Sequence, residues 1–77
     1  MTPHQAYILA YIRDHRRQKG RPPTIRNITT KMGWRSTNTT WHSLDRLREE
    51  GYLLRATGTR GALRLTPKAK AFLEGVL

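Results

Sequence analysis

The chain has 77 residues, which predicts one small domain over residues 1–77 and leaves no length for a separate catalytic domain. Fifteen Lys and Arg residues against five Asp and Glu residues give a net charge of +10, so polyanions, and nucleic acid above all, are the expected partners. The absence of cysteine excludes disulfide bridges and Cys-based zinc fingers, and no apolar run reaches the length of a membrane span.

The first predicted helix begins at Thr2-Pro3, where the hydroxyl caps the helix and proline fits its first position. It continues to about Gln18, and Gly20 ends it. One face repeats at helical spacing and is expected to meet the core: Ile8, Leu9 and Ile12, with Gln5 and Arg16 continuing the row and Tyr7 and Tyr11 widening it. The solvent side is expected to carry Arg13, Arg16, Arg17 and Lys19. The connector 21–23 contains two prolines and cannot be helical.

Two more helices are predicted in close succession, at about Ile25 to Met32 and about Thr37 to Glu50. Thr24 and Ser36 are their caps, and Gly33 ends the first of them. The inner faces are expected to consist of Ile25, Ile28 and Met32 on the first and of Thr40, Leu44 and Leu47 on the second. Trp34 in the turn is expected to fill the core. This spacing is typical of a helix-turn-helix, whose second helix enters a DNA major groove.

Beyond Gly51 the pattern predicts a β-hairpin over residues 52–65 with a glycine-rich tip at 57–61. Thr66-Pro67 then begins a last helix, with Ala69, Phe72, Leu73 and Val76 on one side. We expect Phe72 to cap the core and leave open whether the rest of that face forms a dimer seam. The predicted fold is therefore mainly α with a small β-hairpin: a winged helix-turn-helix of three helices, a two-stranded wing and a C-terminal helix.

Only the first turns of such a second helix reach base edges, so the candidates for base contacts are the outward residues Asn38, Thr39, Trp41 and His42. Asn38 suits the N6/N7 edge of adenine, and a threonine methyl or Trp41 suits a thymine methyl. Three alternatives stay open: Asn38 caps its own helix, Trp41 packs against a neighbouring helix, and His42 contacts only phosphate or water.

Phosphate contacts are expected around the turn and along the two helices, from Arg26, Lys31, Arg35, Ser36 and Arg46. At the wing tip, Thr59 and Arg60 present one arginine on a loop, which suits a narrow minor groove. Each cation taken singly is as often a solvated surface charge. Asp45, Glu49 and Glu50 fall in the later turns of the helix, which favours docking by its N-terminal end.

The same residues resemble the N-terminal DNA-binding domain of the LexA repressors of the bacterial SOS response, over about Thr2 to Leu65. The matching motifs are IRDH at 12–15, PPT at 22–24 after Gly20, Met32-Gly33, RSTN at 35–38, the pair Leu44 and Leu47, Gly51, and RL at 64–65. The resemblance implies that Ser36, Asn38 and Thr39 face an operator. It also implies that the wing contacts the DNA backbone or a partner subunit.

Three departures from that family change what is expected of this chain. Trp41 and His42 stand where LexA proteins use two acidic residues to read their operator, so the recognised sequence is expected to differ. The self-cleaving peptidase domain is missing from the 77 residues, so RecA-stimulated cleavage is not expected. Residues 66–77 resemble the closing helix of other winged-helix regulators, in place of LexA's linker.

No catalytic constellation is visible, so an enzyme is not expected, nor is a cofactor, a metal or a small-molecule ligand. His4 and His15 share a helix face but are separated by about 16 Å of helical rise, too far to hold one metal. The leading hypothesis is a cytoplasmic, bacterial or bacteriophage regulator that binds double-stranded DNA by sequence. It would pair as a homodimer on a palindromic or repeated site and repress by occupying an operator.

The alternative is a small host-takeover or anti-repressor module that grips RNA polymerase or a regulatory protein. An RNA-binding module is less favoured, because the sequence offers no aromatic stacking platform on a sheet.

Overall fold

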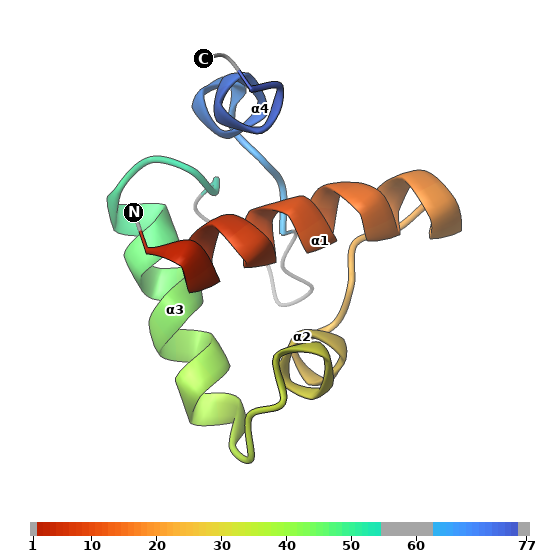
Figure 1. Ribbon diagram of the computed structural model, residues 1–77, viewed down its shortest axis with the longest axis vertical. Coiled ribbons are helices and arrows are strands. Elements are labelled where there is room, and N and C mark those ends of the chain that lie inside the picture. The colour runs from red at the N-terminus through yellow and green to blue at the C-terminus, as the bar shows by residue number, and fades with distance from the viewer. Residues whose placement is uncertain (1, 55–62, 76–77) are drawn as a thin grey trace.

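The computed structural model describes residues 2–54 and 63–75. Within these ranges lie four α-helices: α1 (Pro3–Lys19), α2 (Ile25–Met32), α3 (Thr37–Glu49) and α4 (Pro67–Leu73). Figure 1 shows α1 crossing the middle of the molecule, with α2 and α3 on one side of it and α4 on the other. The mainly helical fold and the C-terminal helix are therefore confirmed, and the ends of α1, α2 and α3 lie within about one residue of those predicted. Helix α4 ends at Leu73, earlier than the predicted face that continued to Val76.

Local capping chemistry explains why the helix ends were predictable. Thr2 accepts a hydrogen bond from the backbone of Gln5, whose side chain accepts one from the backbone of Thr2. Thr24 and Asn27 form the same reciprocal pair at the start of α2. At the other end of α2, Gly33 adopts the left-handed conformation (φ 75°), which glycine reaches without steric cost.

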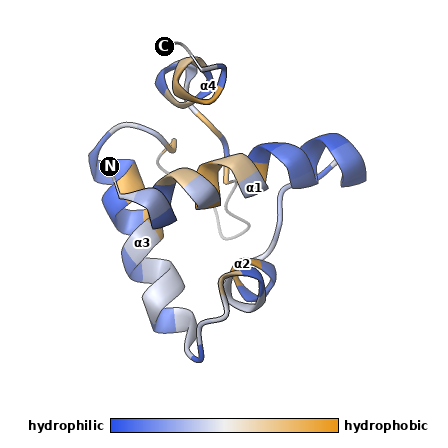
Figure 2. Cartoon of the chain, viewed as in Figure 1, coloured by the Kyte–Doolittle hydropathy of each residue, from blue (hydrophilic) through white to orange (hydrophobic). Residues whose placement is uncertain are grey.

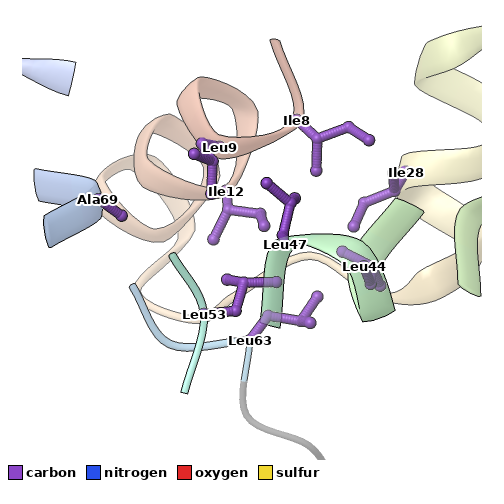
Figure 3. Close-up of a cluster of buried hydrophobic side chains, with 9 residues drawn as sticks. All are labelled: Ile8, Leu9, Ile12, Ile28, Leu44, Leu47, Leu53, Leu63 and Ala69. Carbon is purple, nitrogen blue, oxygen red and sulfur yellow. The ribbon is translucent and has the colours of Figure 1, made fainter. Parts of the chain in front are cut away.

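The hydrophobic core lies between α1, α2 and α3 and is closed by residues that follow α3 (Figure 3). It consists of Ile8, Leu9 and Ile12 from α1, Ile28 from α2, Leu44 and Leu47 from α3, and Leu53, Leu63 and Ala69. Every one of these side chains is at most 5% exposed. The inner faces predicted for α2 and α3 are confirmed, and Trp34 packs against this core as expected.

Two side chains lie outside the core against expectation. Tyr7 is 49% exposed and Phe72 is 44% exposed. Arg16 is exposed, as expected of the solvent side of α1, whose last buried side chain is Ile12. Phe72 instead lies edge-on to the ring of Tyr52, at 6.0 Å between centroids. Ala69, whose side chain is buried, takes the core-facing position of α4.

The predicted wing is represented only by its base. In the described ranges the β-structure is a single antiparallel bridge between Leu53 and Leu65. Beside it, the backbone N–H of Leu54 donates to the carbonyl of Arg64 at 3.0 Å. The tip at 57–61 and Val76 lie outside the described residues. A two-stranded wing is thus not established, although the chain does return antiparallel to itself at this point.

The last helix is fastened to the end of α3 through backbone carbonyls. The Thr66 hydroxyl donates to the Gly51 carbonyl at 2.6 Å, and the Lys68 ammonium donates to the Glu50 carbonyl at 2.8 Å. The same ammonium lies 4.6 Å from the centre of the Tyr52 ring, within cation–π range. These contacts hold α4 at the opposite end of the molecule from the turn between α2 and α3 (Figure 1).

Candidate nucleic-acid interface

Helices α2 and α3 pack against each other and are joined by the short turn 33–36. The turn begins as the backbone N–H groups of Gly33 and Trp34 bond to the carbonyls of Thr30 and Thr29, at 3.1 and 3.0 Å. It ends at Ser36, whose hydroxyl accepts a hydrogen bond from the backbone of Asn38 at 3.1 Å. Because both ends of the turn are fixed by hydrogen bonds, the first turn of α3 is held in place relative to α2.

A buried pair of hydroxyl groups joins the two helices, and the sequence reasoning found only one of them. Thr29 is 7% exposed and Thr40 is fully buried, and their hydroxyl oxygens are hydrogen-bonded to each other. Thr29 also donates to the carbonyl of Ile25 at 2.8 Å. A hydroxyl has one proton, so Thr40 must be the donor to Thr29. The signal that was missed is spacing, since Ile25, Ile28, Thr29 and Met32 fall at i, i+3, i+4 and i+7.

The four residues predicted to touch bases are all exposed on α3. Asn38 does not use its side chain as a cap, because Ser36 fills that role and the Asn38 amide group bonds to no described residue. Trp41 is 46% exposed, so nearly half of its surface is open to solvent.

The predicted phosphate contacts fall into two groups. Arg26, Arg35 and Ser36 are exposed at the first turn of α2 and in the turn that follows it. Lys31 and Arg46 have neighbours in the structure. The Lys31 ammonium lies 5.8 Å from the ring centre of Tyr11 on α1, and Arg46 pairs with Glu50 at 3.3 Å. That ion pair is solvent-exposed and worth little, so it does not prevent Arg46 from reaching a phosphate.

The remaining site predictions are only partly covered by the structure. Thr59 and Arg60 at the wing tip lie outside the described residues. An open groove lies between the start of α1 and the end of α2, lined by Pro3, His4, Tyr7, Lys31 and Met32. Among residues 2–54 and 63–75, no three His, Asp or Glu side chains gather where a metal ion would need them. None of the described helices is long and apolar enough to cross a membrane.

The packed pair of helices, with an exposed polar first turn on the second, defines a helix-turn-helix protein. Comparison with known proteins specifies it further, because the family model of the LexA DNA binding domain matches residues 1–69. The chain belongs to this family.

Individual LexA repressors from distant bacteria are similar to the chain. The protein of Pelotomaculum thermopropionicum is 42% identical over 71% of this chain and 27% of its own length. That of Lactobacillus acidophilus is 38% identical over 90% of this chain and 33% of its own length. That of Aeromonas salmonicida is 34% identical over 96% of this chain and 36% of its own length. The chain thus spans about a third of the length of the curated relatives it matches.

Proposed function

We propose that this protein is a sequence-specific double-stranded DNA-binding transcriptional regulator, a repressor that acts by occupying its operator. The observation that carries the proposal is the division of the first half of α3 into a buried and an exposed side. Its inner side is buried through Thr40 and Leu44, and its outer side exposes Asn38, Trp41 and His42. Membership of the LexA DNA-binding domain family supports the same conclusion.

In this proposal the exposed side chains of α3 read base edges. Asn38 and Thr39 stand in the first turn, where a recognition helix meets the floor of the major groove. The Asn38 amide can pair with both groups on the major-groove edge of adenine, and Trp41 can contact a thymine methyl group. His42 lies one turn after Asn38 on the same face and adds a donor or an acceptor.

Phosphate contacts would fix the position of the helix in the groove. Arg35 and Ser36 lie at the N-terminus of α3, where free backbone N–H groups and the helix dipole already favour an anion. Arg26 and Lys31 on α2 and Arg46 on α3 would add charge at the flanks. A wing carrying Thr59 and Arg60 belongs to the proposal as a contact to the minor groove or backbone.

We also propose that the protein pairs on DNA. One module of this size covers too little DNA for high specificity, and two modules on half-sites about one helical turn apart would supply it. A palindromic or repeated operator follows, with a homodimer formed on the DNA. The site of action would then be the bacterial nucleoid, or the host cytoplasm for a bacteriophage protein.

Selection of binding sites from a random duplex pool at near-physiological salt tests this function. The expected result is an enriched palindrome bound at least ~10³-fold more tightly than a scrambled control duplex. The spacing of its half-sites would report the geometry of the pair. Weak binding without enrichment would contradict the proposal and favour a module directed at a protein.

A further inference from the structure

The C-terminal part of α1 continues beyond the hydrophobic core. The last buried residue of α1 is Ile12, and seven helical residues follow it to Lys19. At the helical rise per residue they extend about 10 Å past the core. We call residues 13–21 the α1 overhang. Figure 2 shows this end of α1 as strongly hydrophilic, in contrast to its middle.

The α1 overhang gathers cations that no acidic side chain neutralises. Arg16, Arg17, Lys19 and Arg21 are all exposed. The ion pairs among the described residues are Arg13–Asp14, Arg46–Glu50 and Arg48–Asp45, and they leave these four cations out. The ring nitrogen Nδ1 of His15 lies 2.9 Å from the Arg21 carbonyl oxygen, and this contact holds Arg21 beside the end of α1.

The helix dipole alone does not account for this arrangement. Cations near a helix C-terminus are favourable in general. Arg16 and Lys19, however, lie close to the helical direction along which Ile8 and Ile12 are buried, and so extend the core-facing stripe into solvent. From Arg16 on the side chains of the helix are exposed, and residues 13–21 contribute no apolar side chain to the core.

The α1 overhang also lies on the opposite side of the molecule from the proposed reading helix. In Figure 1 the orange end of α1 is at the right edge and α3 is at the left edge. A duplex seated against the side of α3 that faces away from α1 and α2 is therefore separated from this end of α1 by the rest of the molecule.

We propose that the α1 overhang is a second phosphate-binding surface, which holds a DNA segment other than the one that α3 reads. The inference rests on the proposed function of α3. A convex helix end that carries cations and no exposed apolar side chain matches the regular phosphates of a duplex, and sequence plays no part in such contacts. A protein partner would call for an aromatic or apolar centre, which the described residues of the overhang lack.

A capture assay tests the inference with the full chain. A duplex carrying the selected site is tethered to beads and saturated with protein, and a labelled second duplex of unrelated sequence is added. The test variant is Arg16→Gln/Arg17→Gln. The matched control is Lys70→Gln/Ala71→Glu, which changes the net charge equally at exposed positions of α4. Circular dichroism establishes that both variants keep the helices.

The wild type and the control variant are expected to capture the labelled duplex. The test variant should capture about tenfold less, the effect of losing two phosphate contacts, while its affinity for the tethered site stays within about threefold. Equal capture by the test variant, or no capture by wild type bound to the tethered site, would overturn the inference. An equal loss of affinity for the tethered duplex would overturn the inference too, because the overhang and α3 would then contact the same duplex. Equal retention on selected and scrambled tethered duplexes would instead contradict the proposed function of α3.

Discussion

At the scale of single residues, Asn38 is the side chain whose proposed role in base recognition can be tested with the least effect on folding. It stands in the first turn of α3, and its amide group bonds to no described residue. Ser36 already supplies the cap, so Asn38 adds little to the stability of the helix. An exposed amide at this position can therefore be changed without disturbing the domain, which makes it a clean probe of base recognition.

We expect Asn38→Ala to relax base preference at one position of the selected site. The affinity for that site should fall by about 1–3 kcal/mol, because a bidentate contact to adenine is lost. Affinity for a scrambled duplex should hardly change. Fluorescence anisotropy on both duplexes, with thermal unfolding as the measure of stability, provides the comparison.

The control for Asn38 is Arg35→Ala, which removes an exposed cation from the adjacent turn. Arg35 is proposed to touch phosphate, so its loss should weaken both duplexes by a similar factor and leave base preference intact. If the two variants gave the same uniform loss, Asn38 would not be a base-reading residue.

Residue-level predictions from the sequence were reliable where the chemistry is local. The caps Thr24 and Ser36 depend on residues two or three positions away, which the sequence displays directly. Tyr7 and Phe72 were placed in the core by their apolar character and spacing, and both are largely exposed. Whether such a side chain is covered depends on which element lies opposite, and helical periodicity does not contain that information.

At the scale of elements, the angle between α2 and α3 is fixed in part by the hydroxyl pair of Thr29 and Thr40. A buried hydrogen-bonded pair constrains geometry more tightly than apolar contact does, because slippage leaves a polar group without a partner. The chain of donors runs from Thr40 to Thr29 and on to the Ile25 carbonyl. The two valine variants are therefore expected to differ.

Thr40→Val should lower the free energy of unfolding by up to about 1 kcal/mol, because Thr29 still donates to the Ile25 carbonyl. Thr29→Val should cost more, about 1–3 kcal/mol, since it leaves the buried Thr40 hydroxyl without its acceptor. The double variant should be more stable than the sum of the two losses predicts. Urea unfolding measures all three, and Thr30→Val on the exposed side of α2 is the control. Strict additivity would show that the two hydroxyls do not interact in solution.

Helix α4 has seven residues, too few to be stable without its cap and its contacts to the end of α3. The Thr66 hydroxyl accepts from the Ala69 backbone and donates to the Gly51 carbonyl, so one side chain serves both purposes. We expect Thr66→Ala to reduce stability by about 1–2 kcal/mol and to release α4 first.

Hydrogen exchange is the measurement for α4. In Thr66→Ala, amide protection should fall in residues 70–74 and persist in the core of α1 and α3. Lys70→Ala, which removes an exposed side chain of the same helix, should leave protection unchanged. Equal loss of protection throughout the chain would mean that α4 and the three-helix core unfold as one unit.

The sequence predicted all four helices because each has its own cap and apolar stripe. The wing was harder, since a hairpin owes its register to pairing across strands and only the Leu53–Leu65 bridge is described. The position of α4 relative to the end of α3 could not be predicted either. It depends on Lys68 and Thr66 reaching the carbonyls of Glu50 and Gly51, contacts made across 15 residues or more of chain.

At the scale of the whole molecule, the excess of positive charge is distributed over two sides. The cations assigned to the α3 side are Arg26, Lys31, Arg35 and Arg46, and a separate set lies on the α1 overhang. The described acidic residues that form ion pairs bond to arginines within four positions of themselves. These short-range pairs leave most of the net charge free to act on a polyanion.

The salt dependence of the DNA affinity measures how many phosphates these cations contact. Four cations contacting phosphate predict a slope of about −3.6 in a plot of log affinity against log salt for a single half-site, and about −7 for a pair on a palindrome. Anisotropy titrations of a half-site duplex and the full palindrome between about 50 and 200 mM salt measure both slopes. Equal slopes on the two duplexes would exclude pairing, and slopes shallower than about −2 would exclude most of the assigned phosphate contacts.

Arg26→Gln should reduce the palindrome slope by about 2, one contact in each protomer, whereas Lys70→Gln on α4 should leave it unchanged. Because counterion release depends only on the phosphates that are neutralised, the slope separates the proposed face of α2 and α3 from the general attraction of a strongly basic protein to DNA.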